Sequence, residues 1–277
     1  MSLVHTSSTR DLVAPAMLAA FDGWIDAAGA ASGAAQLLSD DAEIIATFDD
    51  DLLFDYRSRR PVLDVMDGTL TRLTWPQIAV RHLPRGTRDL LVLSGPEPDF
   101  RWRELGEAIM ELGVRLGVVE WVSLGAIPAA VAHTRPVPVL ATASASGLLK
   151  EGEQQGPPGL LRVPSAALSV IEIAVSGSGI PATGFYAQVP NYVAGPYAPA
   201  SVALLEHASR QLGVELPLGS LAEDAVAQRA NLDALVAAQP EAREYLERLE
   251  QISGADVATG DELASEIERF LREQGGG

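Results

Sequence analysis

The sequence contains no cysteine among its 277 residues. A chain without thiols forms no disulfide framework, no thiolate metal site and no cysteine nucleophile. This composition fits a reducing cytoplasm, which is the location we expect. The amino end shows no signal-peptide pattern, and no segment approaches the roughly 18 consecutive apolar residues that a membrane span requires. We therefore expect a cytoplasmic protein.

Basic residues are also scarce, since 20 Lys and Arg stand against 37 Asp and Glu, a net charge of −17. A surface of that sign repels phosphate backbones and anionic lipids, so we expect neither nucleic acid nor membranes as partners. A protein with a basic face would be attracted, although an acidic surface most often serves solubility alone.

The motifs of the common cofactor, metal and hydrolase sites are missing. The spacing after Gly23 places Ile25 where a dinucleotide fingerprint requires glycine, and no phosphate-binding loop or GxSxG turn is present. The four histidines stand singly, without the spacing of metal ligands. We expect no cofactor and no metal, and no catalytic residue can be assigned.

The chain is nevertheless rich in core-forming residues, with 47% hydrophobic side chains. Residues 16–21 read as a buried strand that breaks at Asp22-Gly23 and leads into a helix of small residues. Gly29 and Gly33 lie four apart, which predicts a bare helix face that can approach a sheet closely. In open α/β sheets, ligands and partners gather at the carboxyl ends of such strands.

The chain then alternates between expected strands and helices up to about residue 212. Strands are expected at residues 43–48, 89–94, 116–124, 137–143 and 183–189, with a hairpin turn at Asp67-Gly68. Helices are expected at residues 100–112, 165–175 and 199–212, the first capped by Asp99 and ended by Gly113. This alternation predicts an α/β fold with a mainly parallel sheet and helices on both faces.

The remaining sequence is strongly charged and contains no expected strand. Helices are expected at residues 221–238, 240–252 and 261–270. We therefore divide the chain into an α/β core at residues 1–215 and a C-terminal helical segment at residues 216–277. The helical segment can pack either on its own core or on a neighbouring subunit.

Polar and aromatic side chains recur where the expected strands end. If the sheet is parallel, these residues line one rim. The candidate rim residues are Asp22, Trp24, Asp26, Glu97, Asp99, Trp102, His133, Thr134, Arg135, Asn191 and Tyr192. Trp and Arg suit a protein interface, and the same mixture suits a small-ligand pocket. The structural alternative is that the carboxylates are helix caps or turn residues and that the histidine is part of the core.

Several of these stretches carry a family resemblance. The motifs are Phe21-Asp22-Gly23-Trp24-Ile25-Asp26, Gly95-Pro96-Glu97-Pro98-Asp99-Phe100-Arg101-Trp102 and His133-Thr134-Arg135-Pro136. Their order and spacing within residues 15–215 resemble the bacterial branch of the proteasome assembly chaperone 2 family. The chain departs from that branch at Ala132 and Asn191, where the branch tends to carry proline and histidine.

The resemblance implies a fold like that of purine nucleoside phosphorylases and a homo-oligomer, for which we expect a trimer or larger. It implies no catalytic set. We favour a non-enzymatic, self-associating binding protein, an assembly factor whose protein partner is proteasome-related. The alternative is a small-molecule hydrolase or nucleoside-type transferase that uses Asp22, Asp26, Glu97, His133 and Arg135, a reading that rests on fold analogy.

Overall fold

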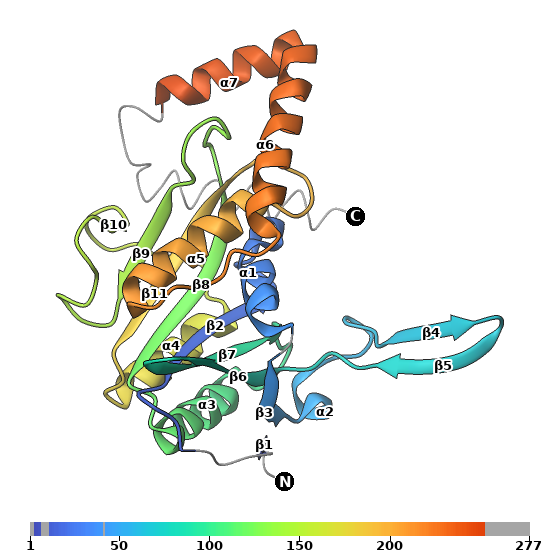
Figure 1. The fold of residues 1–277 in the computed structure, drawn as a ribbon, viewed down its shortest axis with the longest axis vertical. Coiled ribbons are helices and arrows are strands. Elements are labelled where there is room, and N and C mark those ends of the chain that lie inside the picture. Colours follow the sequence, from blue (N-terminus) through green and yellow to red (C-terminus); the bar gives the residue numbers. More distant parts are fainter. Residues whose placement is uncertain (1–2, 7–10, 41, 253–277) are drawn as a thin grey trace.

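The computed structural model describes residues 3–6, 11–40 and 42–252, which form a large sheet flanked by helices and a separate hairpin (Figure 1). The nine strands of the sheet lie in the order β1 (Val4–Thr6), β3 (Glu43–Phe48), β6 (Ala79–Arg85), β7 (Arg88–Pro96), β2 (Ala16–Asp22), β8 (Glu120–Ala129), β11 (Ala182–Pro190), β9 (Val139–Ala143) and β10 (Gln154–Gln155). The four central strands β7, β2, β8 and β11 are parallel to their neighbours in this group, which confirms the predicted α/β class.

Helices cover both faces of this sheet, as predicted. The helices are α1 (Ala30–Ser39), α2 (Asp50–Leu53), α3 (Trp102–Leu116), α4 (Ala167–Gly177), α5 (Ala198–Leu212), α6 (Leu221–Ala238) and α7 (Pro240–Ile252), with a short 3-10 turn η1 (Ala27–Gly29) before α1. Helices α1 and α5 pack on one face, and α3 and α4 pack on the other. Because strand side chains alternate, β2 supplies Ala16, Leu18 and Ala20 to the first face and its other apolar side chains to the second.

The predicted bounds of several elements are confirmed. Strand β3 and helices α6 and α7 have the predicted bounds. Asp67 and Gly68 form the turn between β4 (Val62–Met66) and β5 (Thr69–Thr74), with φ of +49° and +77°. The helix predicted at residues 261–270 lies outside the described residues, and the division of the chain at residue 215 stays a prediction.

The glycine pair near the start of α1 does not share a helix face, so that prediction was wrong. Gly29 is the last residue of η1 and has φ of +60°, a left-handed conformation in which the chain turns into α1. Gly33 lies inside α1, and a Cβ there would lie 3.3 Å from Oγ of Ser201 on α5. The close approach is therefore between two helices.

Helix α3 spans Trp102–Leu116, whereas the sequence predicts a helix at residues 100–112. Asp99 does not cap it, because the Asp99 carboxylate accepts a hydrogen bond from the Asp55 backbone N–H at 2.8 Å. Gly113 is buried inside the helix, which ends instead at left-handed Gly117. Tertiary contacts thus override both local signals.

Strand β8 continues past Gly125, where the sequence predicted its end. A Cβ at Gly125 would lie 2.6 Å from the ring of Tyr186, its partner on β11. The glycine makes room for an aromatic ring across the strands and does not break the strand. Because β8 extends to Ala129, the loop that follows it and contains His133 begins beyond the strand end predicted from the sequence.

Within the described part of the chain, no helix is both long and apolar enough to cross a membrane.

The carboxyl group of Asp50, at the start of α2, predicts a pH-dependent stability. Burial, with the neighbouring carboxylates Asp49 and Asp51, raises the pKa of Asp50 to about 6, against 3.8 for the free side chain. The folded state therefore binds the proton more tightly than the unfolded chain. Protonation of Asp50 therefore stabilises the folded state fully below about pH 4, and this stabilisation is lost as the pH rises through 6.

Asp50→Asn removes this titration. We expect the variant to be more stable than the wild type by about 1 kcal/mol at pH 7, a value discounted because the group is partly exposed. The difference should vanish near pH 4. Urea unfolding at both pH values measures it, with Glu111→Gln on α3 as the control for loss of one negative charge. An equal gain at both pH values would contradict the assignment.

Candidate functional site

The eleven candidate residues all follow the carboxyl ends of the four central parallel strands. Asp22 is paired with Pro96 between β2 and β7, and Ala129 with Pro190 between β8 and β11. Parallel strands end at the same edge of a sheet, so the loops after them share one border. The contacts divide the residues into two groups. The Glu97 group contains Asp22, Trp24, Asp26, Glu97, Asp99 and Trp102, and the His133 group contains His133, Thr134, Arg135, Asn191 and Tyr192.

Glu97 joins two loops of the first group. One carboxylate oxygen accepts the backbone N–H of Trp24 and the other accepts that of Ala167 at the start of α4, both at 2.8 Å. Gly23 makes this approach possible, because a Cβ there would lie 2.4 Å from Cβ of Glu97. Glu97 therefore positions the loop after β2 and satisfies an N–H of the first turn of α4.

Asp26 does the same for α1. One oxygen accepts the N–H groups of Ala31 and Ser32 at 2.7 and 3.2 Å, and the other is buried without a partner among the described residues. Burial raises the pKa of the Asp26 carboxyl, against the hydrogen bonds from Ser32 and Ala31. Asp26 thus supports the start of α1, which is the structural alternative considered for it.

The other members of the first group also have partners within the chain. Asp22 pairs with Arg59 at 2.8 Å, and the indole N–H of Trp102 donates to the Pro98 carbonyl at 2.7 Å. Trp24 leaves 38% of its surface exposed. Apart from Asp26, the carboxylates are bonded within the chain, and one tryptophan is presented to solvent. This part of the rim therefore suits partner binding better than acid–base chemistry.

His133 is the centre of the second group and is 1% exposed. The Tyr192 hydroxyl accepts the His133 backbone N–H at 2.8 Å and lies 2.7 Å from Nδ1. Nε2 lies 3.3 Å from Oδ1 of Asp233, so the imidazole bridges the Tyr192 hydroxyl and the Asp233 carboxylate. Burial also raises the pKa of Tyr192, which keeps its hydroxyl protonated.

Helices α6 and α7 form hydrogen bonds with this second group. Arg229 on α6 donates to the carbonyls of His133 and Arg135, at 3.1 and 2.9 Å. On α7, Glu250 accepts a hydrogen bond from Thr134, and the Tyr245 hydroxyl bonds the Asn191 side chain at 3.1 Å. The C-terminal helices therefore contact the rim of their own chain (Figure 1).

Sequence reasoning missed the residues that α6 and α7 contribute. The omitted residues are Arg229, Asp233, Tyr245 and Glu250. One local signal existed, because Arg229 and Asp233 are four apart and share a helix face. Nothing in their spacing connects them with His133, since that contact spans 100 residues.

Among the described residues, no group of three or more His, Asp or Glu side chains is placed to hold a metal ion.

The comparison with known families decides the relationship. A family model described as the PAC2 family matches residues 20–236. The chain belongs to the PAC2 family. The resemblance inferred from the strand-end motifs is thereby confirmed, and the match extends through most of α6.

Two solved mycobacterial structures share this fold. Mycobacterium tuberculosis Rv2714, a protein of unknown function, is 30% identical, with 97% of this chain and 96% of that chain covered and a TM-score of 0.88. Mycobacterium tuberculosis Rv2125, a proteasome-assembly chaperone homologue, is 35% identical, with coverage of 83% and 99% and a TM-score of 0.76.

A more distant structure shows only that the fold is shared. Pyrococcus furiosus PbaB, an archaeal proteasome activator, is 16% identical, with coverage of 85% and 99% and a TM-score of 0.66. No match was found among the curated proteins.

Proposed function

We propose that this PAC2 protein is a self-associating binding protein of the assembly-chaperone type, acting in the cytoplasm on a proteasome-related protein. Membership of the family and the likeness to Rv2125 support the assembly role. The observation that carries self-association is the β4–β5 hairpin, which projects from the body of the molecule (Figure 1).

The hairpin is apolar although it is exposed. Seven large hydrophobic side chains in and next to it are between 46% and 69% exposed, namely Val62, Leu63, Val65, Met66, Leu70, Leu73 and Trp75. An isolated two-stranded hairpin is at best marginally stable in water, and an apolar patch of this kind marks an interaction surface. We infer that another protein surface covers it.

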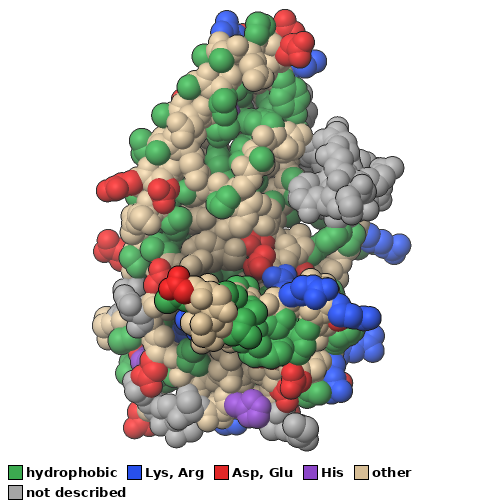
Figure 2. All heavy atoms as spheres, turned by 90° about the vertical axis from the view of Figure 1, so that its right-hand side faces the viewer, with side chains coloured by type: hydrophobic (Ala, Val, Ile, Leu, Met, Phe, Trp, Pro, Cys, Tyr) green, Lys and Arg blue, Asp and Glu red, His purple; other side chains and the backbone are tan. Residues whose placement is uncertain are grey.

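A second copy of the chain is the occupant we propose. Val65 lies opposite Leu70, and Leu63 lies opposite Leu73, so these side chains form one apolar strip. Three arginines lie at the base of the hairpin. Arg57 pairs with Asp55 and Arg59 with Asp22, which leaves Arg60 as the cationic side chain there in a chain of net charge −17. Figure 2 shows basic and hydrophobic side chains side by side on this face, which complements the acidic surface of another copy.

Oligomer mass tests this proposal. We expect the wild type to form a trimer or larger assembly in size-exclusion chromatography with light scattering, and the double variant Val65→Asp/Leu70→Asp to run as a monomer. Thr69→Asp adds a charge near the hairpin tip, opposite Met66, and should keep the assembly. A monomeric wild type, or an assembled double variant, would reject the hairpin as the self-association surface.

The proposed partner is tested separately through the rim. Tagged protein expressed in its own cell should recover proteasome core subunits, and Trp24→Ala should reduce that recovery, because Trp24 is the exposed aromatic side chain of the Glu97 group. Val114→Ala, an apolar side chain that is 56% exposed near the far end of α3, is the control outside the rim. Recovery without any proteasome subunit would count against the partner.

A second candidate function is favoured by one observation, the chain Asp233–His133–Tyr192. A carboxylate, an imidazole and a hydroxyl bonded in this order form an arrangement that enzymes use to activate nucleophiles. A thermal-shift screen with nucleosides, phosphate and divalent metals separates this alternative from the binding role. Stabilisation by a nucleoside that is lost in His133→Gln would favour the enzyme.

A further inference from the structure

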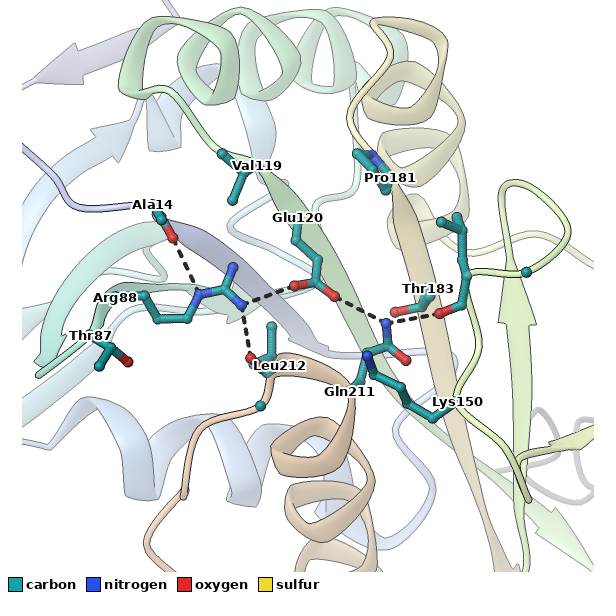
Figure 3. Close-up of a pocket in the computed structure, with 13 residues that line it drawn as sticks. Ala14, Thr87, Arg88, Val119, Glu120, Lys150, Pro181, Thr183, Gln211 and Leu212 are labelled. Carbon is teal, nitrogen blue, oxygen red and sulfur yellow. Dashed lines mark hydrogen bonds and ion pairs between the residues drawn. The ribbon is translucent and has the colours of Figure 1, made fainter.

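A cavity of about 610 Å³ opens at the edge of the sheet opposite the rim, where the central parallel strands begin (Figure 3). Arg88 of β7, Glu120 of β8 and Thr183 of β11 line it on the face covered by α5. The last turn of α5 contributes Gln211, and the loop after β9 contributes Lys150. The volume lies in the range of pockets that hold small organic ligands.

The polar groups of this cavity are held in a fixed frame. The Arg88 guanidinium donates to Oε2 of Glu120 at 3.1 Å and to the Leu212 carbonyl at the end of α5 at 2.9 Å. The Gln211 amide nitrogen donates to Oε1 of Glu120 at 3.0 Å and to the Leu148 carbonyl at 3.2 Å. Both oxygens of Glu120 are thereby used, and its charge is balanced by Arg88.

Two polar atoms of the frame remain unpaired. Thr183 and Gln211 are 1% and 7% exposed, and Oγ1 of Thr183 and Oε1 of Gln211 have no hydrogen-bond partner among the described residues. Buried polar groups are almost always paired, because an unmade hydrogen bond is costly away from water. Both residues line the cavity, so a ligand that enters it can supply the missing hydrogen bonds once neighbouring side chains move aside.

Lys150 supplies the charge of the site. It is the only lysine in the sequence, its side chain is exposed, and it lines the cavity together with Gln211 (Figure 3). A lysine stem is flexible, so the ammonium group of Lys150 can reach the mouth of the cavity. With Arg88 and Glu120 balanced, the lining carries one net positive charge in a strongly acidic protein.

We propose that this cavity binds a small hydroxylated carboxylate. The single uncompensated ammonium group of Lys150 matches a monoanion. Gln211 Oε1 can only accept a hydrogen bond, so the ligand must present an O–H group, and the Thr183 hydroxyl can either donate or accept. A sugar acid of about six carbons combines a carboxylate with several hydroxyl groups and fits the volume.

The test uses the full chain and three six-carbon probes in isothermal titration calorimetry. Gluconate carries both features, hexanoate lacks the hydroxyl groups, and sorbitol lacks the charge. We expect gluconate to bind at least tenfold more tightly than either of the others. Equal binding of all three, or no binding of gluconate at millimolar concentration, would overturn the proposal. Tighter binding of inorganic phosphate than of gluconate would also overturn it.

Two variants connect binding with the cavity. Lys150→Met and Thr183→Val should each weaken gluconate binding about tenfold, and the melting temperature of Thr183→Val should not fall, because the variant removes an unpaired buried hydroxyl. Arg162→Met removes an exposed charge outside the cavity and should bind gluconate like the wild type. Unchanged binding by both cavity variants would place the ligand elsewhere.

The single lysine allows an independent measurement. Acetylation by an amine-reactive reagent, located by mass spectrometry, reports directly on Lys150. Gluconate should slow this modification at least threefold, whereas sorbitol should not. Equal rates with and without gluconate would contradict the role of Lys150.

Discussion

Replacing Gly95 by alanine is expected to lower the free energy of unfolding by about 3 kcal/mol, because the new Cβ has no space. That atom would lie 2.4 Å from the Gln77 carbonyl oxygen and 2.8 Å from Cα of Ile78. Both are backbone atoms of the segment leading into β6, so no side-chain rotation relieves the contact. Gly95 also has φ of +153°, a conformation that favours glycine.

Urea denaturation followed by circular dichroism measures the effect. Gly177→Ala, at the end of α4, is the control, because a Cβ there meets nothing within 4 Å. We expect the control to change stability by less than about 0.5 kcal/mol. A Gly95→Ala variant as stable as the control would show that β6 and β7 separate easily at this edge.

Glu97→Ala is expected to lower the free energy of unfolding by about 2 kcal/mol and to loosen the first part of the rim. The change removes the acceptor for two backbone N–H groups, one of which belongs to fully buried Ala167. Loss of an acceptor at the start of α4 alone corresponds to about 1 kcal/mol. The exposed N–H of Trp24 is recovered in part by water.

Two variants separate this contact from a mere loss of charge. Glu97→Gln keeps one acceptor oxygen and should lose about half as much stability. Glu104→Ala removes an exposed partner of Arg101 and should have little effect, since surface ion pairs contribute little. Hydrogen exchange should be faster at Trp24 and Ala167 in Glu97→Ala than in the wild type. Unchanged exchange at both amides would contradict the bridging role.

The fold could be predicted where the local sequence decides the structure. Asp67-Gly68 is such a case, because both residues adopt positive φ readily and the flanking residues favour strands. The segment before α3 is the opposite case. Asp99 has the chemistry of a cap, yet its carboxylate serves Asp55, a residue that only the folded chain brings near. Gly113 and Gly125 likewise allow close packing and do not end the helix or the strand in which they lie.

The candidate site divides in the same way. Strand periodicity was sufficient to place Glu97 and His133 at one edge of the sheet, because parallel strands share their carboxyl ends. The partners of His133 were not predictable from spacing, since Asp233 and Arg229 reach it from a helix placed by tertiary packing. The cavity at the other edge left no motif, because Arg88, Glu120 and Gln211 come from three separate elements.

The position of β2 in the sheet constrains the order in which the protein assembles during synthesis. This strand leaves the ribosome early, yet its Ala16 pairs with Leu90 on one side and with Glu120 on the other. The apolar residues of β2 are all buried in the folded sheet, and this burial requires that both neighbouring strands have been translated. Pairings so distant in sequence slow folding. Until β8 is translated, β2 has only one of its two neighbours, and its apolar residues are not fully covered.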